Sequence, residues 1–149
     1  MKKMIFIVLS VILHNFLFAD NNEIAAWSYE VKKKSDDKFE IILNADISEK
    51  WYIYGINIEE GGPLPLNFYF EDSKNIRFLK EFIETETPQK LYDEIFKMNV
   101  PYYDKSVSFK AVVQIRNTQN NTLIIDGQAC YMVDNSCVRV YQEIPIEFK

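Results

Sequence analysis

Short runs of alternating apolar and polar residues constrain this chain more than any other feature of its sequence. The clearest run is VSFKAVVQI, residues 107–115, in which every second residue from Val107 to Ile115 is apolar. A period of two places successive side chains on opposite faces of a β-strand. No segment sustains an apolar period of 3.6 residues, so the pattern indicates strands and not helices.

About eight such runs follow one another along the chain at the spacing typical of sandwiches and barrels. They cover residues 27–34, 39–47, 51–59, 66–71, 76–84, 107–115, 122–133 and 137–148. This pattern predicts an all-β fold, an antiparallel immunoglobulin-like sandwich, as one domain over residues 20–149. We interpret PQKLYDEIFKM, residues 88–98, as a long irregular loop, although Leu91, Ile95 and Met98 share one side of it.

The first nineteen residues have the features of a secretory signal. Lys2 and Lys3 precede an apolar run, and Ala19 offers a small residue for cleavage. The alternative is a retained membrane anchor, but the run is shorter than the about 20 residues of a bilayer span and His14 interrupts it. We therefore expect export, cleavage after Ala19, and a periplasmic protein with no stable membrane anchor.

The expected mature chain excludes several classes of function. His14 is the only histidine, so its removal excludes Ser-His-Asp and Cys-His nucleophiles and leaves a poor ligand set for zinc. Without Lys2 and Lys3, 15 of the 17 basic residues remain against 22 acidic ones, a net charge of −7. This balance argues against nucleic acid or an anionic membrane surface as a partner. We expect no metal and no other cofactor.

Both cysteines, Cys130 and Cys137, lie in the stretch GQACYMVDNSCVRV. A disulfide between them can persist after export. By lowering the entropy of the unfolded chain, this short ring would stabilise the fold by roughly 2.5 kcal/mol. A sixty-residue ring across a sandwich would stabilise it by about 4.3 kcal/mol. The pair is therefore badly placed to act as a structural staple.

The geometry of the hairpin constrains this pair further. If Asp134 and Asn135 formed a tight two-residue turn, the cysteines would lie diagonally and too far apart for a relaxed bond. Direct pairing requires the strands to stop at the cysteines, which leaves YMVDNS, residues 131–136, as a wide loop. A disulfide at the mouth of a loop is open to attack and to exchange. From the residues alone, a structural staple and a redox-active pair both remain open.

The order of four motifs over nearly the whole mature chain resembles a known family. The motifs are EKWYIYG, GGPLPLNFYF, YDEIFKMNVPYYDK and GQAC before Cys130. In this order they resemble the N-terminal periplasmic domain of the thiol:disulfide interchange protein DsbD, an immunoglobulin-like domain that passes reducing equivalents outward. The family usually has a hydrophobic residue and two prolines after its second cysteine, where this chain has CVRV.

The resemblance implies a set of site residues. Cys130 and Cys137 would be the redox pair, with Cys137 bonding the partner and Cys130 resolving the mixed disulfide. Phe96 would be a removable lid over the sulfurs, or else a residue that packs the core or a loop. Asp93 and Glu94 would raise the cysteine pKa by like-charge repulsion. The aromatic surround would be Tyr52, Tyr54 and Tyr103, although Tyr52 and Tyr54 also suit ordinary strand positions.

The resemblance also implies partners, and it leaves one competing hypothesis. Electrons would come from a thioredoxin-like donor or a membrane electron transporter, and would pass to disulfide-bearing periplasmic acceptor proteins. The chemistry would be thiolate exchange. The competing hypothesis is an exported immunoglobulin-like binding module whose disulfide merely closes a recognition loop.

Overall fold

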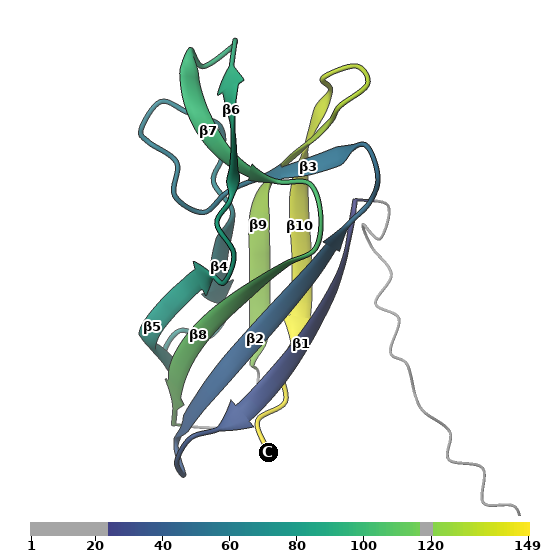
Figure 1. Ribbon diagram of the computed structural model, residues 1–149. Helices are drawn as coiled ribbons and strands as arrows, with labels where there is room; N and C mark the ends of the chain where they lie inside the picture. The colour runs from purple at the N-terminus through teal and green to yellow at the C-terminus, as the bar shows by residue number, and fades with distance from the viewer. Residues whose placement is uncertain (1–23, 117–120) are drawn as a thin grey trace, which may run out of the picture.

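The computed structural model describes residues 24–116 and 121–149, and within them the chain forms two facing antiparallel sheets (Figure 1). The described residues form ten strands and no helix, so they contain no helix that could cross a membrane. The predicted all-β, immunoglobulin-like sandwich is confirmed. The predicted signal, residues 1–19, lies outside the described residues.

One sheet has four strands in the order β1-β2-β8-β5. Strands β2 and β8 bury alternate residues, as their sequence pattern predicts. Leu43 lies opposite Phe109 in their ladder, and both side chains are buried. The bounds are β1 (Ala25–Lys33), β2 (Lys38–Ile47), β5 (Ile76–Glu84) and β8 (Val107–Ile115).

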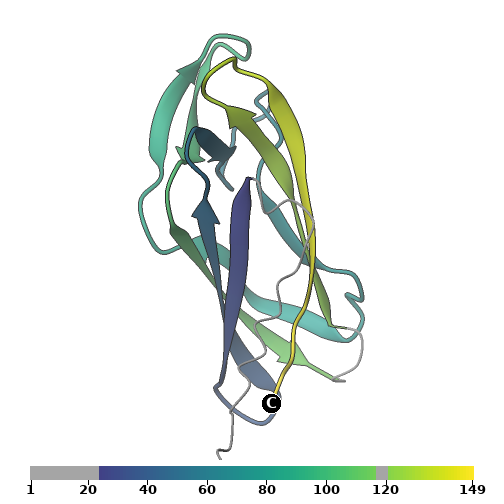
Figure 2. The same cartoon turned by 90° about the vertical axis from the view of Figure 1, so that its right-hand side faces the viewer.

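The other sheet has six strands in the order β10-β9-β3-β7-β6, and β4 pairs with β9 beside this path. Figure 2 shows that β1 and β10, the outer strands of the two sheets, lie on the same side of the sandwich. The bounds are β3 (Trp51–Tyr54), β4 (Asn67–Phe70), β6 (Gln89–Asp93), β7 (Met98–Tyr103), β9 (Thr122–Tyr131) and β10 (Cys137–Pro145).

The main core fills the space between the sheets and is rich in aromatic rings. The ring centroid of Phe68 lies 4.9 Å from that of Phe109 and 4.7 Å from that of Phe82. Large aromatic side chains dominate core energetics because each buries much apolar area. The fold is therefore held mainly at the sandwich centre, and the cysteines lie at one end of it.

The interpretation of residues 88–98 as an irregular loop is wrong, because β6 and β7 form a hairpin there. Leu91 pairs with Val100, and Asp93 pairs with Met98. The strands are too short, at five and six residues, to show a clear alternation. The predicted strand 51–59 ends earlier, at Tyr54, and the predicted strand 137–148 ends at Pro145.

Candidate functional site

The two cysteines form a disulfide at the end of the β9–β10 hairpin. Cys130 and Cys137 are direct partners in the ladder, with an S–S distance of 1.99 Å and Cα atoms 4.0 Å apart. The pairing of β9 with β10 stops there, and residues 132–136 form the β9–β10 loop. Within this loop the amide of Asn135 donates to the carbonyl oxygen of Tyr131 at 2.9 Å.

The two cysteines differ sharply in exposure. Cys130 is 0% exposed, whereas Cys137 is exposed. Cys130 belongs to a small group that we call the satellite cluster, because it is separate from the main core. An attacking thiolate can therefore reach Cys137 but not Cys130. The satellite cluster consists of Tyr54, Val100 and Cys130, with Tyr52, Ile58, Leu91 and Met98 packed against it.

A second hairpin tip lies beside the disulfide, and a buried carboxylate organises it. Residues 94–97 form the β6–β7 turn, which begins after Asp93. One oxygen of Asp93 accepts hydrogen bonds from the amides of Ile95, at 2.9 Å, and Phe96, at 3.2 Å. The other oxygen accepts a hydrogen bond from the Tyr54 hydroxyl at 2.7 Å. The same carboxylate thus ties the turn to itself and to β3.

Burial and hydrogen bonding act in opposite directions on Asp93. Burial raises the pKa of its carboxyl group, but the hydrogen bonds from Tyr54 and the two turn amides outweigh it and hold the pKa below its usual range. Burial also raises the pKa of Tyr54, and the neighbouring Tyr52 and Asp93 raise it further, so the phenol remains a proton donor. Glu94, in contrast, is exposed and pairs with Lys97 at 3.0 Å.

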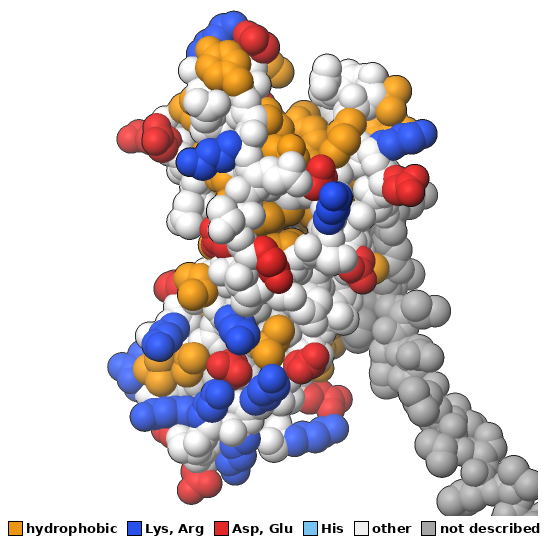
Figure 3. All heavy atoms as spheres, in the orientation of Figure 1, with side chains coloured by type: hydrophobic (Ala, Val, Ile, Leu, Met, Phe, Trp, Pro, Cys, Tyr) orange, Lys and Arg blue, Asp and Glu red, His pale blue; other side chains and the backbone are white. Residues whose placement is uncertain are grey.

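A pocket of about 210 Å³ lies between the two hairpin tips. The tips stand apart at one end of the molecule (Figure 1), and hydrophobic side chains gather between them (Figure 3). Ile95, which is 79% exposed, lines this pocket together with Cys137. The full lining consists of Tyr52, Tyr54, Leu91, Tyr92, Asp93, Glu94, Ile95, Asn135 and Cys137. A larger hollow of about 650 Å³, beside the start of β5, contains neither cysteine.

Two of the three predicted tyrosines lie beside the disulfide. Tyr52 is directly opposite Cys130 in the β3–β9 ladder, and its ring centroid lies 5.4 Å from that of Tyr54. Tyr103 instead points into the main core, where its ring centroid lies 5.5 Å from that of Phe109. Tyr102, which the sequence pattern did not indicate, also lies here, with its ring centroid 5.5 Å from that of Tyr52.

The predicted lid residue is not among those that line the pocket. Phe96 is half-buried, and its neighbour Ile95 is the residue of the turn that lines the pocket with Cys137. Asp93 carries the signal that could have indicated this, because an Asp side chain often accepts hydrogen bonds from amides two and three residues later and so fixes a turn. Asn135, from the opposite tip, was also missed.

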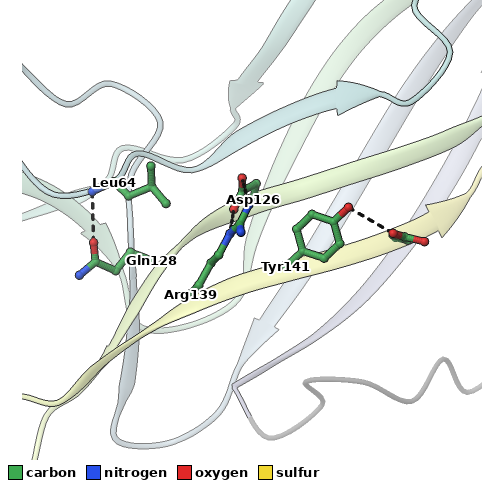
Figure 4. A network of polar contacts seen from close by, with 6 residues as sticks. Leu64, Asp126, Gln128, Arg139 and Tyr141 are labelled. Carbon is green, nitrogen blue, oxygen red and sulfur yellow. Dashed lines mark hydrogen bonds and ion pairs between the residues drawn. The ribbon is translucent and has the colours of Figure 1, made fainter.

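A polar network lies close to the disulfide on β9 and β10 (Figure 4). The guanidinium of Arg139 binds both carboxylate oxygens of Asp126 at 2.7 Å, and this holds the pKa of Asp126 below its usual range. The guanidinium carbon also lies 5.2 Å from the centroid of the Tyr141 ring. Bidentate pairs of this kind fix geometry. The pair of Arg139 with Asp126 therefore ties β10 to β9 two residues beyond Cys137.

Fold and site together define a class: an immunoglobulin-like sandwich domain with a disulfide at the end of one hairpin, beside a second hairpin tip, with one cysteine exposed and the other buried. The family model described as "Thiol:disulfide interchange protein DsbD, N-terminal" matches residues 21–145, so the chain belongs to this family. The resemblance inferred from the motifs is confirmed.

Two solved structures show the same fold. The N-terminal periplasmic domain of ScsB from Proteus mirabilis has a TM-score of 0.61 at 19% identity, over 88% of this chain and 49% of that chain. The reduced N-terminal domain of DsbD from Neisseria meningitidis has a TM-score of 0.54 at 14% identity, over 87% of this chain and 94% of that chain. This chain thus spans about half of the ScsB chain. No curated protein matches it.

Proposed function

We propose that this chain is a periplasmic thiol–disulfide exchange protein that passes reducing equivalents through Cys130 and Cys137 to exported partner proteins. The observation that carries the proposal is the asymmetry of the disulfide in a member of the DsbD N-terminal family. Cys137 is exposed and Cys130 is fully buried. A structural staple has no need of an accessible sulfur, whereas disulfide exchange requires one.

Reduction of the domain takes two exchange steps. A donor thiolate attacks Sγ of Cys137, the bond to Cys130 breaks, and Cys130 leaves as a thiolate that takes up a proton. A second donor thiolate then attacks the donor's own sulfur in the mixed disulfide and releases Cys137 as a thiolate. Two electrons have moved, so the donor is oxidised to a disulfide and the domain is a dithiol.

Passing the electrons on reverses these roles. The thiolate of Cys137 attacks the disulfide of an acceptor protein and forms a mixed disulfide, with one acceptor thiolate leaving. Cys130 then loses its proton and attacks Sγ of Cys137, which re-forms the internal disulfide and releases the second acceptor thiolate. In this scheme Cys137 bonds each partner and Cys130 resolves the bond.

The exposed apolar side chains on the two hairpins that flank the pocket suit a protein partner. Exposed apolar side chains that gather in one place are a feature of protein interaction sites. In this family the corresponding partner is a thioredoxin-like domain, and we assign the same class of donor here, either free or as part of a membrane electron transporter. The side chains are those of Tyr92 and Ile95 on one tip, and of Met132, Val133 and Val138 on the other.

We also assign a covering role to the β6–β7 turn as a whole. Ile95 lines the pocket with Cys137, and Phe96, the residue that the resemblance identifies with the lid, is the next residue in the same turn. Cys137 is already exposed, and a partner that displaces this turn widens the access to its sulfur further.

A second candidate is a binding module with a structural disulfide, which the exposed Met132 and Val133 of the β9–β10 loop favour. The reduction potential of the pair, with its rate of reduction by a thioredoxin-like protein, separates the two. A potential below about −300 mV with sluggish exchange would indicate a structural bond. In a Cys130→Ala variant, a mixed disulfide trapped at Cys137 supports the exchange function.

A further inference from the structure

The strands at the ends of the two sheets differ in how well their edges are protected against pairing with another chain. Proteins block exposed strand edges with lysines, prolines, bulges or short strands. Strand β1 ends in Lys32 and Lys33, β5 has two register irregularities, and β6 is only five residues long. Strand β10 is nine residues long, and it has no lysine and no proline before its last residue, Pro145. No described strand pairs with its outer side, so β10 has the least protected edge.

The ladder between β9 and β10 determines which backbone groups lie on this edge. The amide of Tyr131 donates to the carbonyl oxygen of Ser136 at 2.8 Å, so these two residues form a hydrogen-bonded pair. In an antiparallel ladder such pairs alternate with pairs that share no backbone hydrogen bond, and Cys130 with Cys137 is the next pair. The amide and carbonyl groups of Cys137, and two residues later those of Arg139, therefore point away from β9.

The side chain of Arg139 leaves this edge open. Its guanidinium binds both carboxylate oxygens of Asp126 at 2.7 Å, so the side chain turns over β9 and away from the free edge of β10 (Figure 4). Cys137, Val138 and Arg139 are all exposed. Proline at position 139 would lack the outward amide, whereas CVRV keeps it. An added strand can therefore reach the backbone directly beside the exposed sulfur.

The spacing of an added strand matches that of a mixed disulfide at Cys137. A disulfide joins residues whose Cα atoms are usually about 5.5–6 Å apart. The Cα atoms of a hydrogen-bonded pair in neighbouring antiparallel strands are about 5.5 Å apart. A partner cysteine bonded to Cys137 therefore lies at the distance of a residue in an added strand, provided that its own segment is extended. A cysteine within a helix does not meet this condition, because a helix uses its backbone groups internally.

We propose that the free edge of β10 at residues 137–139 is a strand-addition site, which selects acceptor proteins whose disulfide lies in an extended segment. This proposal rests on the proposed function and names its substrate class. The thiolate of Cys137 attacks one sulfur of the acceptor disulfide, so that one S–S bond forms, one breaks, and the other acceptor sulfur leaves as a thiolate. The acceptor backbone meanwhile pairs with the outward groups of Cys137 and Arg139. Main-chain hydrogen bonds supply the affinity in this mode, so conformation counts for more than the acceptor's sequence.

The first test uses the reduced wild-type chain and a pair of peptides. One peptide has valine and threonine on both sides of a single cysteine, which is held as a mixed disulfide with 2-nitro-5-thiobenzoate. Its twin has the same sequence, but the amides of the cysteine and of every second residue from it are N-methylated. Release of the coloured thiolate measures the attack by Cys137, and rates with 2-mercaptoethanol correct for intrinsic reactivity. The unmethylated peptide should react about tenfold faster, a factor that two ordinary hydrogen bonds support.

Two substitutions at one position locate the effect at the edge of β10. Arg139→Pro removes the outward amide, whereas the matched control Arg139→Ala removes the same side chain, with its bond to Asp126, and keeps the amide. An edge position whose amide points outward tolerates proline. The preference for the unmethylated peptide should persist in Arg139→Ala and largely disappear in Arg139→Pro. Thermal unfolding and the alkylation of Cys137 by iodoacetamide should be similar in the two variants.

Three results would overturn the strand-addition site. They are equal rates for the two peptides, a preference that Arg139→Pro retains in full, and self-association of the wild type that Arg139→Pro abolishes, which would assign the edge to a second copy of this chain. If Arg139→Pro unfolds, the peptide pair decides on the wild type alone. Equal reaction with both peptides leaves the proposed function standing, whereas no reaction with either, together with resistance to a thioredoxin-like donor, removes both proposals.

Discussion

Removing the cysteines one at a time tests the asymmetry on which the proposed function depends. Cys137→Ala leaves Cys130 as a buried thiol, and Cys130→Ala leaves Cys137 as an exposed one. Because the thiolate is the reactive form, the comparison uses rate constants for the thiolate, obtained from the pH dependence of alkylation. We expect Cys137 to react much faster than Cys130.

The size of the difference follows from what must open to expose Cys130. The satellite cluster has to separate, which exposes Val100 at a cost of about 1.5 kcal/mol. The hydrogen bond between Tyr54 and Asp93 also breaks, at about 1.5–3 kcal/mol. The sum is roughly 3–4.5 kcal/mol, which corresponds to a ratio of rates between about 10² and about 2 × 10³.

Iodoacetamide is a suitable reagent, and mass spectrometry follows the reaction. Thermal unfolding of both variants provides the control, since each should remain folded without the disulfide. Equal rates within a few-fold, with both variants folded, would falsify the burial argument and with it the assignment of Cys137 as the sulfur that partners attack.

Three further predictions concern pH and stability. The pKa of Asp93 is below its usual value of 3.8, so its contribution to stability is complete above that value and is lost as pH falls through the lower folded pKa. Thermal unfolding below pH 4 should therefore show a loss that Asp93→Asn lacks. Arg139→Ala should lower the denaturant midpoint slightly, and Arg139→Lys should recover only part of the loss, because lysine cannot bind Asp126 in a bidentate manner. Gly127→Ala should destabilise the domain by about 1–3 kcal/mol in chemical denaturation, because a Cβ there would lie 2.9 Å from Cδ1 and 3.2 Å from Cα of Leu66.

The regular part of the fold could be predicted because its pattern is local. Residues 107–115 alternate over their whole length, and β8 occupies the same residues. The wide loop that a direct pairing of Cys130 with Cys137 requires could also be deduced from local sequence, since residues opposite each other in a hairpin are related by the length of the loop. In both cases neighbouring residues carry all the information that the prediction needs.

The β6–β7 hairpin could not be predicted, because its pattern depends on distant residues. Asp93 is a buried charged residue near the end of a short strand, and it is tolerated there because Tyr54 donates to it from β3. Local reasoning places such a residue in a loop. Similarly, period two separates Tyr102 from Tyr103, but only the pairing of β7 with β3 decides which of them faces Tyr52.

The segment after Cys137 shows how this chain holds its exposed sulfur without the prolines that the resemblance led us to expect. Proline stiffens a strand through its fixed φ and its missing amide proton. Here the side chain of Arg139 restrains β10 instead, by binding Asp126 on β9, and its guanidinium carbon lies 5.2 Å from the centroid of the Tyr141 ring. This restraint lies on a side chain and leaves the backbone amides of β10 in place. The position of Cys137 should therefore be sensitive to substitution of Arg139, which offers a way to alter the exchange rate without substituting either cysteine.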